Sequence, residues 1–546
     1  MSQRRAAAVV TVVAACVGLT ACGARLSPQQ RSVALRAQAG GAVAGAAAAG
    51  TGATGTGATD GTGTTTDPGA APVDGSAPAA GAAAPIAGAP AAAARGVAAP
   101  VAGAPVGGSS GTRSTGGAVT GKTATGQVAA KPGTPTKATT KAAARTKAAT
   151  APAAAAAPAA APNCGAGART NSDVGVTAND ITIANASDIS GAVPGLFLSA
   201  REAVQAFVAY YNATGQTVCG RTLKYLPLDS RADQNGDRDA ATQACGQSFA
   251  MVGSISAFDQ GGAPVVQQCG IPDIRTSANT KERQSVPNVF GANSAKLNLI
   301  STSVPDYVVQ KFPDAAKNAA YVYINVGVGQ QQKVAVVNAY TKRGFHFTDT
   351  IPIDIGDVSY NQYAQQLKRD GIKFVQFLGA YQQSAKLAQA FKSQGYKPDF
   401  FLLDFASYNP DYIAQAADAG EGTYIYNSAT PFEEASSNPE TLLYLQWLQR
   451  TNAQAAPSAF GEFAWSAARL FVTEATKAGT DLKRAKVLAA LAAEHAWTGN
   501  GITSPQDVGG KATGKCFFFQ QLQGGKWARV SPASGYTCGD LIDANA

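Results

Sequence analysis

The sequence predicts an α/β protein in which two doubly wound parallel-sheet lobes follow a disordered tether. Two observations support this prediction. The composition changes abruptly near residue 164, where an Ala, Gly, Thr and Pro tract gives way to a sequence of mixed composition. From Val174 onward, short apolar runs alternate with amphipathic stretches of helical length, and this alternation occurs in two successive series.

Residues 22–163 form the predicted tether. The tract from residue 23 to 163 contains no aromatic residue, so it cannot bury enough apolar surface to offset the entropy of ordering. This tract holds 11 Lys and Arg against 3 Asp, whereas the part from residue 164 has a net charge of −1. The net charge of +9 therefore belongs mainly to the tether, and it does not indicate a nucleic-acid partner for the folded part.

Residues 1–21 are predicted to be a lipoprotein signal peptide. Arg4 and Arg5 precede an apolar run, 6–19, that is too short to span a membrane comfortably. The segment from Leu19 to Cys22 resembles the lipobox of bacterial lipoproteins, in which the Cys is acylated. This resemblance implies lipidation of Cys22, with chains such as palmitate, and a location on the extracytoplasmic face of the cell membrane.

Two motifs within the tether match catalytic patterns without the structural context that the chemistry needs. Residues 116–123 fit the P-loop pattern, but no apolar strand precedes them and no amphipathic helix follows. Residues 107–111 fit the nucleophile-elbow pattern, again without a strand or helix around them. We interpret both as accidents of composition in a spacer that holds the folded part away from the membrane.

The most informative stretch is 250–275, which is predicted to be a compact βαβ unit. Its apolar strand ends at a small polar loop, 254–262, and a short helix then leads to a second strand at 271–274. In open parallel sheets, ligands bind beyond the carboxyl ends of the strands. The loop therefore places Ser256 and Phe258 where a ligand would be met, although a tight turn alone would also explain its Gly and Ser residues.

Predicted strands and helices also alternate in the stretch that precedes this unit. Strands are predicted at 181–186 and 223–228, with a helix at 198–212 between them. The acidic segment 229–239 has its Gly and acids out of phase for a calcium loop, so we expect it to cap a helix that begins at Asp239.

A second series of alternating elements follows. We expect helices from Pro439 and Ala459 to return to the first lobe, and the stretch 516–530 to form a terminal hairpin. The predicted strands are 320–325, 345–353, 373–378, 400–403 and 423–426, and the predicted helices are 330–343, 360–369, 382–394 and 410–419. Two α/β lobes in tandem would place two sets of strand ends at one cleft.

Six Cys residues remain after Cys16 and Cys22 are set aside, an even number that suits three disulfides in an exported chain. These six Cys allow 15 connectivities. Proximity in the sequence favours Cys516 with Cys538, and successive helices on one sheet face favour Cys245 with Cys269. Cys164 would then pair with Cys219.

The residues for catalysis and for metal binding are scarce. No C-x2-C pair exists, and His346 and His495 are the only two His, so we expect no metal site and no other cofactor. Without a Ser, His and Asp arrangement on plausible loops, we also expect the protein not to be an enzyme.

Residues 164–546 resemble the substrate-binding lipoproteins of ABC importers, specifically the leucine/isoleucine/valine-binding branch with the type I periplasmic-binding fold. Four stretches carry the resemblance, and their shared order is more specific than any one of them: DITIANASDISGAVPG, AMVGSISAFDQGGAP with GIPDI, FVQFLGAYQQSAKLAQAFKSQGY, and FFLLDFASYNPDY. In that family, two lobes joined by three hinge strands close on a ligand without changing it covalently. The resemblance implies lobes of 164–300 with 429–505, and of 301–428 with 506–546.

The resemblance also implies candidate ligand-binding residues. Tyr381 matches a pocket Tyr of the family, and Asp404 lies one position from the acid that pairs the ligand's ammonium group. A second pocket Tyr of the family falls near Gly329 here. The remaining candidates are polar or aromatic residues of the corresponding loops: Phe197, Ser256, Phe258, Ser277 and Asn279. Arg275 is a possible cation and Tyr408 a possible aromatic wall, although ion pairing and core packing would explain them equally well.

These residues suit a small polar or amphipathic ligand, amino-acid-like in character. The resemblance implies that the protein captures this ligand and passes it to an ABC transporter permease. The alternative is a tethered ligand sensor or a surface protein that binds another partner on the same fold.

Overall fold

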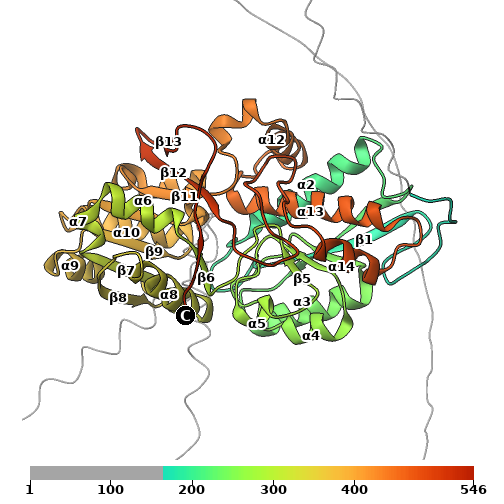
Figure 1. Ribbon diagram of the computed structural model, residues 1–546, viewed down its shortest axis with the longest axis horizontal. Coiled ribbons are helices and arrows are strands. Elements are labelled where there is room, and N and C mark those ends of the chain that lie inside the picture. The colour runs from blue at the N-terminus through green and yellow to red at the C-terminus, as the bar shows by residue number, and fades with distance from the viewer. Residues whose placement is uncertain (1–163, 546) are drawn as a thin grey trace, which may run out of the picture. The chain divides into compact units, whose positions relative to one another are not determined.

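The computed structural model describes residues 164–545, which fold around two large β-sheets (Figure 1). The predicted signal peptide, Cys22, the tether and its two pattern matches lie outside the described residues. Both sheets are doubly wound, with helices on each face, as the sequence predicted.

The first sheet is entirely parallel and has the strand order β2-β1-β3-β4-β5. Its strands are β1 (Asp180–Ser187), β2 (Thr222–Asp229), β3 (Ala250–Val252), β4 (Asp273–Arg275) and β5 (Val289–Gly291). Its helices are α2 (Leu198–Ala213), α3 (Gln234–Gln247), α4 (Ala263–Cys269), α5 (Lys281–Gln284), α12 (Pro439–Thr451), α13 (Ala459–Ala478) and α14 (Arg484–Ala492).

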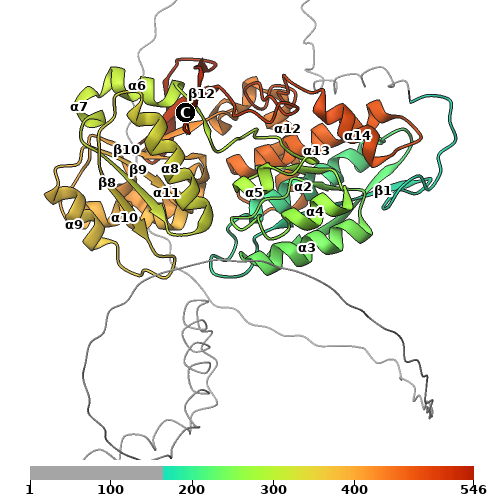
Figure 2. The ribbon, with the colours of Figure 1, turned by 60° about the horizontal axis from the view of Figure 1, so that its bottom comes forward.

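Alternating side chains of β1 build two cores in this lobe, because successive residues of a strand point to opposite faces. Ile181 and Ile183 pack with α2 and α13 on one face, and Ala184 and Ala186 pack with α3 and α4 on the other. Figure 2 shows α3 and α4 on the opposite side of this lobe from α13 and α14. The long helices α12 and α13 thus return to the first lobe, as expected.

The second sheet has the order β13-β12-β11-β10-β9-β7-β8. Its parallel strands are β7 (Ala319–Ile324), β8 (Phe347–Ile353), β9 (Phe374–Leu378), β10 (Phe400–Leu403) and β11 (Tyr424–Asn427); the hairpin β12 (Cys516–Gln523) and β13 (Lys526–Ser531) continues the sheet antiparallel to β11. One face packs against α6 (Ser303–Lys311), α7 (Pro313–Ala316) and α8 (Gly327–Thr341), and the other against α9 (Asn361–Arg369), α10 (Tyr381–Ser393) and α11 (Pro410–Ala416).

The short elements of this half complete the list. They are the strands β6 (Leu299–Ser301), β14 (Thr537–Cys538) and β15 (Leu541–Asp543), and the 3-10 helices η1 (Phe405–Ser407), η2 (Ala417–Gly420) and η3 (Phe432–Ser437). β14 pairs with β12, and β15 pairs with β6.

Three segments carry the chain between the lobes: β5 to β6, β11 to α12, and α14 to β12. Hydrogen bonds join these segments to one another. The Ser504 backbone N–H donates to the Ser428 carbonyl at 2.7 Å, and the Gly514 N–H donates to the Ser294 carbonyl at 3.1 Å. The connections therefore form one hydrogen-bonded unit at the junction of the lobes.

One helix start differs from the prediction. α3 begins at Gln234 and is capped by Asp233, whose side chain accepts from the Gly236 N–H at 2.7 Å. The prediction of a start at Asp239 is therefore wrong. A Cβ at Gly236 would lie 2.1 Å from the Ser230 carbonyl oxygen, so only glycine permits this close approach and the helix can begin earlier.

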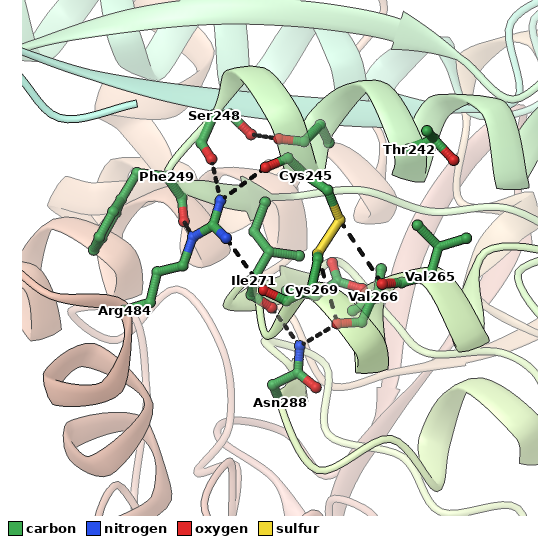
Figure 3. The surroundings of a disulfide bond; sticks show 12 residues. Thr242, Cys245, Ser248, Phe249, Val265, Val266, Cys269, Ile271, Asn288 and Arg484 are labelled. Carbon is green, nitrogen blue, oxygen red and sulfur yellow. Dashed lines mark hydrogen bonds between the residues drawn. A yellow bond between two sulfur atoms is a disulfide. The ribbon is translucent and has the colours of Figure 1, made fainter. Parts of the chain in front are cut away.

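The three disulfides are Cys164–Cys219, Cys245–Cys269 and Cys516–Cys538, the pairings that the sequence favoured. The second joins the ends of α3 and α4 (Figure 3). Beside it, the Arg484 guanidinium donates to four backbone carbonyls, those of Cys245, Ser248, Phe249 and Cys269. Arg484 therefore fastens α14 to the ends of both helices.

Candidate functional site

A cavity of about 270 Å³ lies between the two sheets. Its walls come from the loops that follow parallel strands, which is where open α/β sheets bind ligands. The first lobe contributes the loops after β1, β3 and β4, and the second contributes those after β7, β9 and β10. The lining is predominantly apolar, and the charged residues in it are Lys296 and Asp404.

Five of the seven predicted ligand-binding residues line this cavity. They are Phe197, Phe258, Ser277, Asn279 and Asp404. Their loops are separated by up to about 200 positions in the chain, and the fold brings them together because all follow the carboxyl ends of strands.

Buried carboxylates hold the first-lobe loops in place. Asp188 accepts from the Ala257 N–H at 2.8 Å, so the loop after β1 fixes the loop after β3. Asp259 accepts from the N–H groups of Asn279 at 2.8 Å and Thr280 at 3.1 Å, so the loop after β3 fixes the loop after β4. The Asn279 side-chain amide completes this connection by donating to the Ser256 carbonyl at 2.9 Å.

A cluster of fully buried charges lies beneath these loops. Arg275 is 3.3 Å from Asp273 and 3.6 Å from Asp259, and Arg283 is 2.8 Å from Asp273 and 3.5 Å from Asp237. Burial raises the pKa of Asp237 to about 6, against the opposing effect of Arg283. Arg275 also donates to the Ser277 carbonyl at 3.3 Å. Through these contacts, Arg275 and Asp259 of the cluster hold the loop 277–280, which lies at the cavity, in place.

Arg275 is consequently not a ligand-binding cation. Its side chain has no exposed surface and is engaged by the two carboxylates. Tyr408 is likewise a core residue: its ring stacks on Phe432, and its hydroxyl donates to Glu433 at 2.5 Å. Both side chains therefore contact partners in the protein interior and do not line the cavity.

Ser256 and Tyr381 lie next to the cavity but are not among its lining residues. The Ser256 hydroxyl accepts from the Phe258 N–H at 3.0 Å, which shapes the loop. Tyr381 is the first residue of α10, and its hydroxyl donates to Asp411 at 3.2 Å. Burial, together with the negative charge of Asp411, raises the pKa of Tyr381 to about 12.

Asp404 is the acid of the cavity. It follows β10 and caps η1, where its Oδ1 accepts from the Ala406 N–H at 2.9 Å. Burial raises the pKa of this carboxyl to about 7, and the bond from Ala406 opposes the rise only in part. Within residues 164–545, Asp404 takes part in no salt bridge, so its charge is uncompensated in the ligand-free protein.

Aromatic side chains connect the two lobes across this site. Phe197 packs edge-on against Phe460 with ring centroids 5.0 Å apart, and Phe460 packs against Phe405 at 5.3 Å. Phe460 comes from the first turn of α13, more than 250 positions after Phe197. Phe460 was not among the predicted binding residues, because an aromatic residue near a helix start gives no sign of which distant loop it contacts.

Gly329, near which the family's second pocket Tyr falls, also lines the cavity. A Cβ here would lie 2.1 Å from the Ile324 carbonyl oxygen. With this backbone no side chain fits at position 329, and that part of the wall is instead formed by Ile324, Val326 and Val328. The cavity wall beside Gly329 is therefore aliphatic.

The described part of the chain offers no group of three or more His, Cys, Asp or Glu that could hold a metal ion. Among the helices within 164–545, none is long and apolar enough to cross a membrane.

Comparisons with known proteins agree with this geometry. A family model described as periplasmic binding protein matches residues 180–526. No curated protein matches the sequence.

Similar solved structures include three binding proteins. The fatty acid ABC transporter substrate-binding protein of Thermomonospora curvata has a TM-score of 0.58 at 18% identity, over 68% of this chain and 94% of that one. The branched-chain amino acid binding protein LivJ of Streptococcus pneumoniae, in complex with isoleucine, has a TM-score of 0.56 at 15% identity, over 66% and 100%. A solute binding protein of R. palustris, in complex with 4-hydroxybenzoate, has a TM-score of 0.56 at 17% identity, over 67% and 98%.

These identities are low enough that the likeness to solved structures shows the fold alone. The family match spans most of the part of the chain that the structure describes, including every loop of the cavity. The chain therefore belongs to the periplasmic binding protein family and has the type I periplasmic-binding fold that its sequence resembles.

Proposed function

We propose that this protein is an extracytoplasmic solute-binding lipoprotein that captures a small amphipathic ligand in the cavity between its lobes and delivers it to an ABC importer. The observation that supports this proposal most strongly is the composition of the cavity, in which a predominantly apolar wall holds a carboxyl, Asp404, that forms no salt bridge and has a raised pKa. Binding sites of this kind derive affinity from apolar burial and orientation from a few polar groups. Cys22 is the proposed lipid anchor.

Asp404 is the proposed partner of a hydrogen-bond donor on the ligand, either an ammonium group or a hydroxyl. Phe197, Phe258, Ser277 and Asn279 contact the body of the ligand in this proposal, because they line the same cavity. Ser256 and Tyr381 influence binding indirectly in this proposal. Ser256 shapes the loop that carries Phe258, and Tyr381 joins the start of α10 to Asp411. An amino-acid-like ligand fits this arrangement, provided that its apolar portion is large.

A thermal-unfolding screen of the full-length protein tests the proposal. The panel would contain amino acids, amides, organic acids and sugars, and a ligand present at 100 times its Kd should stabilise the protein by about 2.7 kcal/mol. A shift from one chemical class supports a solute receptor. The absence of any shift would contradict it and favour the alternative role as a tethered sensor or partner-binding protein.

Two variants locate the binding site once a ligand is found. Asp404→Asn keeps the shape of the side chain and removes its charge, so it should weaken an ammonium-bearing ligand by about 30-fold or more, because a buried charge loses its partner. Asp399→Asn is the matched control, since Asp399 is exposed and does not line the cavity. Equal affinities in the two variants would refute the assignment of Asp404.

A further inference from the structure

A second cavity, of about 590 Å³, adjoins the first. The two share a wall formed by the segment that leaves the first lobe after β5, together with neighbouring residues: Ala278, Gln284, Ser294, Ala295, Lys296, Leu297 and Ala335. Gln284 fixes this wall, because its side chain donates to the Ala278 carbonyl at 2.7 Å and accepts from the Leu297 N–H at 2.9 Å.

The charged residues that line the second cavity are all cationic. They are Lys281, Lys296 and Lys511, and among residues 164–545 no Asp or Glu lines this cavity. Within residues 164–545, none of the three Lys forms a salt bridge with a carboxylate. Since the described part of the chain as a whole is close to neutral, three Lys without a salt bridge around one cavity are a local excess of positive charge, which the more distant Asp543 carboxylate offsets in part through its attraction to Lys296.

Lys511 is the most constrained of the three. Its ammonium donates to the carbonyls of Val286 at 2.9 Å and Pro287 at 2.8 Å, and it lies 4.8 Å from the ring centroid of Phe290. Burial lowers the pKa of Lys511. An ammonium has three donors, and these contacts use two of them while the side chain still lines the cavity.

Lys281 and Lys296 have fixed backbones and unpaired side chains. The Lys281 N–H donates to Gln331 of α8 at 2.9 Å, which connects the two lobes. The Lys296 N–H donates to the Thr513 hydroxyl at 2.8 Å, and that hydroxyl in turn donates to the Lys296 carbonyl at 3.0 Å. Both ammonium groups are therefore attached to anchored positions at the cavity and remain available to a ligand.

We propose that the second cavity binds the acidic group of the ligand, a carboxylate or a phosphate ester, while the apolar body of the ligand lies in the first cavity. This inference rests on the proposed solute-binding function and specifies its substrate class as an amphipathic acid, whose body also carries the hydrogen-bond donor proposed for Asp404. Lys296 lines both cavities and would mark the point where the apolar body meets the acidic group. Lysine ammonium groups bind either acid as point charges.

A set of matched probes tests the charge preference by calorimetry on the full-length protein. Octanoate, octyl phosphate and octanol share one apolar chain and differ only in the end group. We expect octanoate or octyl phosphate to bind at least about tenfold more tightly than octanol, since charge-assisted hydrogen bonds are stronger than neutral ones. The comparison of the two acids distinguishes carboxylate from phosphate recognition.

The double variant Lys281→Gln/Lys296→Gln tests whether the preference for anionic probes arises at the second cavity. It should reduce the affinity for the preferred anion by about tenfold or more and leave that for octanol unchanged. The control Lys317→Gln/Lys373→Gln removes two exposed Lys that line neither cavity, and it should leave all affinities unchanged. The preference should also weaken as ionic strength rises.

Anions that bind no more tightly than octanol would overturn the inference, as would equal losses in the Lys281→Gln/Lys296→Gln variant and its control. These failures differ from a failure of the proposed function. If another ligand of the screening panel binds in an Asp404-dependent way, the solute-binding function stands and only the anionic substrate class is refuted. If neither the panel nor the probes bind, both proposals fail.

Discussion

Asp404→Asn should stabilise the ligand-free protein, and the stabilisation should depend on pH. The pKa of Asp404 is about 7 in the folded protein, against an ordinary value of 3.8. A tenfold difference in proton affinity corresponds to about 1.4 kcal/mol, so ionisation of this carboxyl destabilises the folded state by up to about 4 kcal/mol above pH 7. Asn retains an oxygen that can accept from the Ala406 N–H, so the cap of η1 is kept.

The direction in which stability changes with pH follows from the release of the Asp404 proton. The pKa is raised in the folded state, so the stabilising contribution of the protonated group is complete below about pH 4, where both states bind the proton. Between about pH 4 and pH 7 the unfolded chain releases its proton while the folded protein retains it, and stability falls as pH rises. The variant has no proton to release and should not show this loss.

Urea unfolding of the wild type and of Asp404→Asn, without ligand, measures this difference at several pH values. The two proteins should have similar stabilities near pH 4, and the variant should be more stable by about 2–4 kcal/mol near pH 8. Other groups that titrate in this range, such as Asp237, contribute equally to both proteins and cancel. A stability difference that does not change with pH would refute the reasoning, as would a wild type that is the more stable protein at pH 8.

Two further predictions concern the supports of the first lobe. Arg484→Met should lower the free energy of unfolding by about 2–4 kcal/mol, because four backbone carbonyls lose their donor; urea unfolding that shows a loss below about 1 kcal/mol would contradict this. Asp259→Asn should weaken the binding of every ligand, whatever its charge, since Asp259 holds Asn279 and Thr280 in place and neutralises Arg275. Calorimetry with charged and neutral ligands checks the second prediction, and a loss confined to one charge class would speak against it.

The fold was largely predictable from the sequence because its signals are local. Apolar runs and amphipathic stretches correspond closely to the strands and helices of both lobes, and the stretch 250–275 forms the strand, loop, helix and strand that its pattern indicates. The start of α3 was placed too late, since several acids in that segment can cap a helix. The choice between them depends on the close approach of Gly236 to the Ser230 carbonyl, a tertiary contact that no local pattern reveals.

The candidate site was predictable in its loops but only partly in its side chains. The rule that ligands meet the carboxyl ends of parallel strands identified the loops that hold Phe258, Asn279 and Asp404. This rule could not indicate that Asp259 and Asp273 neutralise Arg275 in the interior. Nor could it indicate that Phe460 of α13 lines the cavity and packs against Phe197. Both facts depend on tertiary contacts between different loops and helices, and the periodic pattern of one sequence does not indicate which side chains make them.

The acids of the binding region differ in how well the protein satisfies them, and this difference is the physical argument for the role of Asp404. Asp188 accepts from Ser230, Ala232 and Ala257, and Asp259 accepts three bonds besides its proximity to Arg275. Such carboxylates position loops, and their several bonds offset much of the cost of burial, although burial still raises the pKa of Asp188. Asp404 accepts one backbone bond and faces an apolar cavity with a raised pKa. A carboxyl that the fold itself leaves undersatisfied is best matched by a donor that arrives with the ligand.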